Sequence, residues 1–152
     1  MAAVVTLTQF EYTPADVSPV SLDGQLWLLG QLAQLLSDAI AKSPPAVFFS
    51  QQVQQLVQQV QRVERQDRAE VLRDLVAGGE ARLSYRYRTL NRDMKLVFWC
   101  RMGPTLCPYL DLEPLCKDEQ DYLYKIVNSF ARMDSNQQFH WLRKLLETQN
   151  VQ

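Results

Sequence analysis

The sequence has few of the residues that enzymes use to hold metals, phosphates or cofactors. Among its 152 residues there is one histidine, His140, and three cysteines, Cys100, Cys107 and Cys116, which do not form CxxC pairs. A zinc site is therefore not indicated. The five glycines never form GxGxxG or GxxxxGK, the two common phosphate-binding patterns. No base or orienting acid lies close to Cys100 in the sequence, as a thiol nucleophile requires. We predict that the protein is not an enzyme.

Long apolar runs and an excess of one charge are also absent. No stretch of 18 or more apolar residues occurs, and the opening "MAAVVTLTQFEYTPADVSP" lacks the basic region of a signal peptide. The formal net charge is −1, so no overall field favours nucleic acid. We expect a cytoplasmic protein with no membrane span, reduced thiols and an oligomeric state that the sequence does not indicate.

Apolar residues recur at three- and four-residue spacing along most of the chain, and nothing alternates with period two. Possible N-caps are Ser21 or Asp23 for the first helix and Asn91 or Asp93 for a later one. Ser135 and Gln138 stand in capping-box spacing. The predicted helices span about 21–43, 50–66, 67–78, 82–90, 91–103, 117–133 and 134–149.

The predicted fold class is therefore all-α, a helical bundle of about six to seven helices. Residues 21–152 are expected to form a single helical domain. Residues 1–20, which include Pro14 and Pro19, are expected to form an extended leader.

The segment "KLVFWCRMG" places Phe98 and Trp99 side by side between two cations, Lys95 and Arg101. Neighbouring residues on a helix point about 100° apart, so the two rings cannot both face one narrow seam. The segment then contacts protein on two sides, or protein on one side and another molecule on the other.

A second concentration of residues is "ARLSYRYR", in which Arg82 and Arg86 are four positions apart and share a helix face. Arginine is enriched at protein interfaces. The residues are consistent with a solvated face or with a docking patch for an acidic protein.

The order of these pieces resembles a known family. "RAEVLRDLVAGGEARLSYRYRTLNRDMKLVFWCRMG" is similar to the N-terminal carotenoid-binding domain of the orange carotenoid protein and to its stand-alone relatives, the helical carotenoid proteins of cyanobacteria. The matching elements are the helix end 73–76, Ser84 with Tyr87, and the "KLxFW" residues from Lys95 to Trp99. "LDGQLWLL" and "QQFHWLRKLL" resemble the opening and closing helices of that domain.

The resemblance implies an all-helical domain that holds a keto-carotenoid in its interior, with Trp99 as a ring wall and Phe98 as a core anchor. Cys100 stands where the family has an aromatic residue, and Gly30 and Ala33 stand where it has rings that grip the pigment. The cofactor-binding residues that it implies are Trp99, Trp27, Leu26, Gly30, Ala33, Tyr87 and Cys100.

Two functions follow from this resemblance. The first is a carotenoid-binding photoprotective protein that quenches excitation energy or singlet oxygen. The second is a pigment-free helical adaptor that binds a phycobilisome or photosystem component, through which it would associate with the thylakoid surface. Its partner-binding residues would be Arg82, Arg86 and Arg143.

Overall fold

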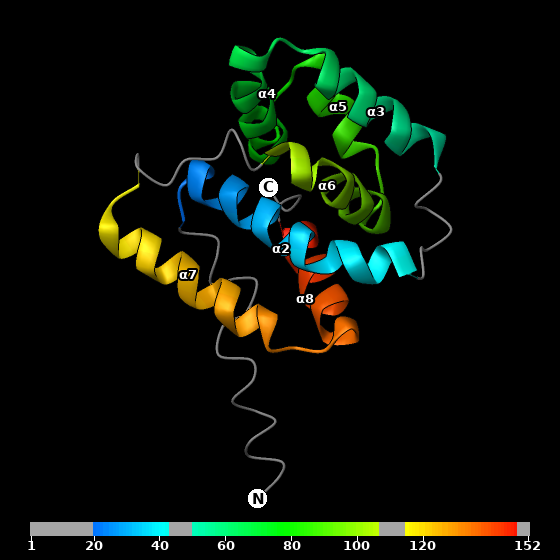
Figure 1. The fold of residues 1–152 in the computed structure, drawn as a ribbon. Helices are drawn as coiled ribbons and strands as arrows, with labels where there is room; N and C mark the ends of the chain where they lie inside the picture. Colours follow the sequence, from blue (N-terminus) through cyan, green and yellow to red (C-terminus); the bar gives the residue numbers. More distant parts are fainter. Residues whose placement is uncertain (1–19, 43–49, 107–114, 149–152) are drawn as a thin grey trace, which may run out of the picture.

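The computed structural model describes residues 20–42, 50–106 and 115–148. Within these ranges the secondary structure consists of seven helices and contains no strand (Figure 1), which confirms the predicted all-α fold. The segment predicted as a leader lies outside the described residues, apart from Val20. The helices are α2 (Leu22–Lys42), α3 (Gln51–Arg62), α4 (Arg65–Ala77), α5 (Arg82–Arg88), α6 (Arg92–Leu106), α7 (Lys117–Ala131) and α8 (Ser135–Thr148).

Helix α2 occupies the centre of the bundle. Figure 1 shows it between α3, α4, α5 and α6 on one side and α7 and α8 on the other, and it contacts α4, α6, α7 and α8. Because neighbours surround it, apolar residues cover more than one side of this helix. Leu26, Leu28, Leu29, Leu32 and Leu36 all have no accessible surface.

Helix α3 shows the opposite pattern, with one apolar stripe. Val53, Leu56, Val57 and Val60 are buried, whereas most of the glutamines between them are exposed. The buried stripe packs against α5 and α6. The glutamine-rich segment is therefore an ordinary amphipathic helix.

The helix ends resolve several alternatives in the sequence. The Ser21 hydroxyl accepts a hydrogen bond from the Gly24 amide at 3.1 Å, and the Asn91 side chain accepts one from the Met94 amide at 2.9 Å. Ser21 and Asn91 are therefore the N-caps of α2 and α6. Helix α4 ends as predicted at Gly78, whose φ of 74° is in the left-handed region that suits glycine.

The predicted capping box of α8 is displaced by one residue. Asp134 and Gln137 make the reciprocal pair: the Gln137 amide donates to Asp134 Oδ1 at 2.8 Å, and the Asp134 amide donates to Gln137 Oε1 at 3.0 Å. Gln138 is instead buried and donates to the Phe130 carbonyl at 2.9 Å. Its side chain ties α8 to the end of α7, so it does not cap its own helix.

Several predicted helix boundaries differ from the structure. Helix α3 ends at Arg62, before the predicted end at 66, and α5 ends at Arg88, before the predicted end at 90. Helix α4 begins at Arg65, two residues before Asp67, and α6 continues to Leu106 past Gly103 and Pro104. A proline lacks one backbone donor, so α6 loses the single hydrogen bond to the Cys100 carbonyl but is not interrupted there.

A close approach joins the start of α2 to the start of α7. The Ser21 backbone amide and hydroxyl both donate to Glu119 Oε1, at 3.0 and 2.6 Å. A Cβ atom on Gly24 would lie 2.6 Å from the same carboxylate oxygen and 2.5 Å from Val20 Cγ1. The lack of a side chain at Gly24 therefore permits this contact.

Candidate functional site

Three aromatic rings form a buried cluster where α5 packs beside α6. Tyr87 of α5 contacts both Phe98 and Trp99 of α6 edge to face, with ring centroids 5.6 and 5.9 Å apart. Trp99 Nε1 donates a hydrogen bond to the Tyr87 hydroxyl at 2.7 Å. Burial raises the pKa of Tyr87, so its hydroxyl stays protonated. The cluster is a closed aromatic and hydrogen-bonded unit.

The adjacent rings of Phe98 and Trp99 on α6 lie in the same buried cluster. Phe98 and Trp99 both have no accessible surface, their centroids are 5.1 Å apart, and both contact Tyr87. The helix directs their Cα–Cβ bonds apart, but the side chains are long enough to meet around Tyr87. The segment therefore contacts protein on both sides.

Lys95 lies in the same cluster. Its side chain is 1% exposed, and its Nζ is 5.1 Å from the centroid of the Tyr87 ring. Within the described parts of the chain the amine makes no hydrogen bond. Burial lowers its pKa because the charged form loses its hydration. Sequence reasoning missed the burial of this residue, since a lysine is expected at the surface.

The predicted residues of α2 are also buried. Leu26, Gly30 and Ala33 are spaced by four and three positions, so they share one face of the helix. Trp27 contacts Tyr124 of α7 edge to face, with centroids 5.4 Å apart. The structure thus places all these side chains in the interior.

Cys100 is buried as well. Burial raises the pKa of its thiol to about 12, because the thiolate would be poorly solvated. A thiol in this state is a weak nucleophile at neutral pH. Its role in the described structure is packing.

The predicted partner-binding arginines occupy two places. Arg82 and Arg86 lie on the short helix α5. Arg143 lies on α8, where it pairs with Asp93 at 2.9 Å and its guanidinium carbon is 5.9 Å from the centroid of Phe139. The structure therefore brings Arg82 and Arg86 together and places Arg143 in a separate contact with the start of α6.

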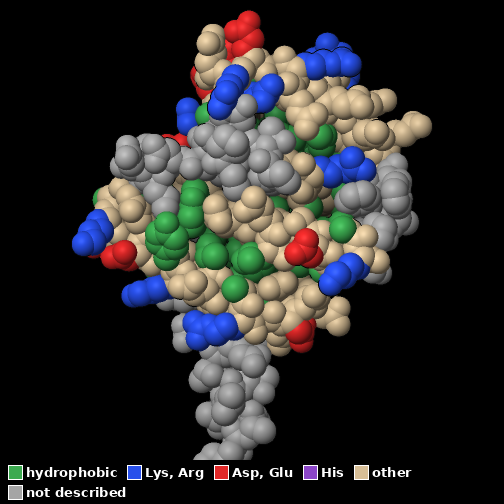
Figure 2. Space-filling model, viewed as in Figure 1, with side chains coloured by type: hydrophobic (Ala, Val, Ile, Leu, Met, Phe, Trp, Pro, Cys, Tyr) green, Lys and Arg blue, Asp and Glu red, His purple; other side chains and the backbone are tan. Residues whose placement is uncertain are grey.

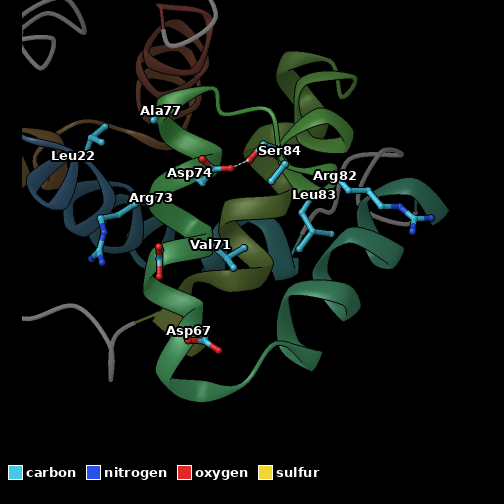
Figure 3. Close-up of a pocket in the computed structure, with 11 residues that line it drawn as sticks. Leu22, Asp67, Val71, Arg73, Asp74, Ala77, Arg82, Leu83 and Ser84 are labelled. Atoms are coloured by element: carbon cyan, nitrogen blue, oxygen red, sulfur yellow. Dashed lines mark hydrogen bonds between the residues drawn. The ribbon is translucent and has the colours of Figure 1, made fainter.

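A pocket of about 570 Å³ lies along α4 and the start of α5 (Figure 3). Its lining includes Val71 and Leu83 as apolar residues, and the Ser84 hydroxyl donates to Asp74 across it at 2.5 Å. None of the seven predicted cofactor-binding residues lines this pocket, whereas Arg82 does. Sequence reasoning missed the pocket, because helix periodicity does not reveal the space between α4 and α5.

Figure 2 shows hydrophobic side chains near the middle of one face, with lysine and arginine toward its edges. Across the described ranges no helix is long and apolar enough to cross a membrane. In the same ranges no three metal-ligating side chains are grouped to hold an ion.

Comparison with known proteins identifies the family. No curated protein and no solved structure matches the chain. The family model described as the N-terminal domain of the orange carotenoid protein matches residues 5–152, which includes most of the segment predicted as a leader. With its all-helical fold and buried "KLxFW" residues on α6, the chain belongs to the family of orange carotenoid protein N-terminal domains.

Proposed function

We propose that the protein binds a carotenoid in its interior and protects by quenching excitation energy or singlet oxygen. The observation that carries this proposal is the family match over residues 5–152, which includes the buried aromatic cluster of Tyr87, Phe98 and Trp99. The proposal makes the protein non-enzymatic, since quenching requires no bond to be made or broken.

The residues of the interior suit such a ligand. Tyr87 and Trp99 offer flat apolar rings, and Gly30 and Ala33 are small side chains on a buried face of α2. Together with Leu26 they would form a dry apolar wall for a polyene. The conjugated system of the carotenoid supplies the energy acceptor, and these residues bind it, orient it and exclude water.

Contact with Trp99 requires movement of its neighbours. The Trp99 side chain has no accessible surface, and its Nε1 is held by the Tyr87 hydroxyl at 2.7 Å. A ligand that reached this ring would have to separate side chains that now contact one another. The proposal therefore includes a rearrangement between α2, α5 and α6 on binding.

The test is the visible absorption spectrum of the protein purified from a carotenoid-producing host. The expected result is a structured band that co-elutes with the protein and weakens in Trp99→Leu. Trp141→Leu is the matched control, because Trp141 is also buried but contacts Phe130 between α8 and α7. A colourless, folded wild-type protein from that host would refute the proposal.

The second candidate is a pigment-free adaptor for a phycobilisome or photosystem component. It is favoured by the complete burial of Trp99 against protein. It is also favoured by the guanidinium groups of Arg82 and Arg86 on α5, which make no ion pair with any residue that the structure describes. In this function the protein would be cytoplasmic and would reach the thylakoid surface through its partner. Salt-sensitive binding to purified phycobilisomes that is lost in Arg82→Glu/Arg86→Glu would support it.

A further inference from the structure

One face of the molecule, formed by α4 and α5, carries charges of opposite sign on the two sides of an apolar strip. Figure 3 shows Asp67 at one end of α4, then Val71 and Leu83, and then Arg82. Both apolar residues line the pocket, and Leu83 also packs against the core. We call this the α4–α5 face. Its residues are Asp67 and Glu70 on the acidic side, Val71 and Leu83 in the strip, and Arg82 and Arg86 on the basic side.

Other charges around the pocket already have partners. Arg73 pairs with Asp23 of α2 at 3.0 Å, and Asp74 accepts a hydrogen bond from Ser84 at 2.5 Å. These contacts hold α4 against α2 and α5 within one molecule.

The four charged residues of the α4–α5 face differ in this respect. In the part of the chain that the structure describes, Asp67, Glu70, Arg82 and Arg86 make no ion pair with one another or with other residues. Two carboxylates and two guanidinium groups therefore remain available to another molecule.

We propose that the α4–α5 face binds a second copy of this chain in a two-fold symmetric dimer. A two-fold axis through the apolar strip pairs each face with itself, so that one side of the strip meets the opposite side of its partner. The arginines of α5 in one protomer then face the carboxylates of α4 in the other, and the same contact repeats across the axis. The Val71 and Leu83 side chains of the two protomers meet at the centre.

Charge complementarity is the reason for choosing a second copy. A uniformly acidic partner would be repelled by Asp67 and Glu70, and a uniformly basic partner would be repelled by Arg82 and Arg86. The matching surface must carry both signs, on opposite sides of an apolar centre. The chain itself provides that surface.

The dimer can be tested with variants in which the charges on one side of the face are reversed. Their association is measured by sedimentation velocity at low salt. The wild type is expected to dimerise reversibly. Arg82→Glu/Arg86→Glu places four carboxylates on each face, and Asp67→Arg/Glu70→Arg places four guanidinium groups there. Each double variant alone is expected to dimerise at least about tenfold more weakly, because attraction is replaced by repulsion at both symmetric contacts.

Mixing the two double variants gives the decisive measurement. In the mixed dimer every reversed position meets an opposite charge, so both contacts are attractive again. An equimolar mixture is therefore expected to recover the wild-type affinity as a heterodimer. The chain with all four changes is expected to recover it as a homodimer.

Lys117→Glu/Lys125→Glu is the matched control. Both lysines are exposed on α7, and the variant has the same change in net charge as Arg82→Glu/Arg86→Glu. It is expected to dimerise like the wild type. Circular dichroism of each variant establishes that it is folded before its affinity is interpreted.

Three results would overturn the proposal. One is a wild type that stays monomeric at the highest soluble concentration. The second is a mixture of the two double variants that remains monomeric. The third is a control variant that dissociates as much as Arg82→Glu/Arg86→Glu does, which would mean that net charge governs association. A monomer that binds phycobilisomes through Arg82 and Arg86 would assign the basic side to the adaptor function instead.

Discussion

Replacing Tyr87 with phenylalanine would remove one hydroxyl group from the buried aromatic cluster and leave its three rings in place. The Tyr87 hydroxyl accepts the only hydrogen bond that the structure describes for Trp99 Nε1, at 2.7 Å. Tyr87 is 1% exposed and Trp99 has no accessible surface, so water would not replace the lost acceptor. Tyr87→Phe therefore leaves a buried donor without a partner.

The expected loss of stability follows from that unsatisfied donor. Such a group costs about 1–3 kcal/mol, out of a total free energy of unfolding of about 5–15 kcal/mol for a domain. For a chain of this size the melting temperature should fall by roughly 2–4 °C for each kcal/mol. The ring contacts of residue 87 with Phe98 and Trp99 contribute little to the change, since phenylalanine keeps the ring.

The assay is urea-induced unfolding followed by far-UV circular dichroism. The urea concentration at the midpoint should fall. The slope of the free energy of unfolding against urea concentration should stay constant, because the surface exposed on unfolding is unchanged. Tyr85→Phe is the matched control: it is the same substitution on the same helix, but Tyr85 is 62% exposed. Equal free energies of unfolding for the two variants would refute the role assigned to the Tyr87 hydroxyl.

Three further substitutions test other parts of the structure. Lys95→Met should stabilise the protein by roughly 1 kcal/mol near neutral pH in thermal unfolding, because removing a buried amine without a hydrogen bond outweighs the loss of its contact with an aromatic ring. Burial lowers the pKa of that amine, so the gain in stability should vanish as the pH rises to the ordinary lysine pKa near 10.5. A gain that does not depend on pH would contradict this account. Gly78→Ala should cost about 1–2 kcal/mol in urea unfolding, because Gly78 has a left-handed φ of 74°, and an unchanged midpoint would argue against that conformation. Burial raises the pKa of Cys100 from 9.0 to about 12, so above pH 9 the unfolded thiol ionises first and stability falls by about 1.4 kcal/mol per pH unit. In urea unfolding at several pH values, Cys100→Ala should abolish this decrease in stability above pH 9. Cys116→Ala should leave the decrease unchanged, since Cys116 is exposed.

Most of the fold could be predicted because helix formation leaves a periodic record in the sequence. The stripe Val53, Leu56, Val57 and Val60 predicts both the existence of α3 and its buried face, and the structure confirms them. Helix ends are less well predicted, because several residues near an end can serve as caps. Asp134 caps α8 in place of Ser135, and the choice depends on contacts that the local pattern does not contain.

The candidate site could be predicted only in part, since burial does not specify neighbours. The seven predicted cofactor-binding residues are all buried, but the role of each in binding stays a prediction. The Tyr87–Trp99 hydrogen bond depends on how α5 packs beside α6, and the burial of Lys95 depends on the same arrangement. No periodic signal in either helix encodes these tertiary contacts.

The central position of α2 affects how the chain can fold during synthesis. Among the described helices α2 is made first, yet all four helices that cover it follow in the sequence, and Ser21 meets Glu119 across 98 positions. The side of α2 that α7 and α8 cover therefore stays exposed on the nascent chain until these two helices have emerged from the ribosome. A message truncated before Lys117 would consequently yield an aggregation-prone chain that depends on chaperones, and not a smaller stable domain.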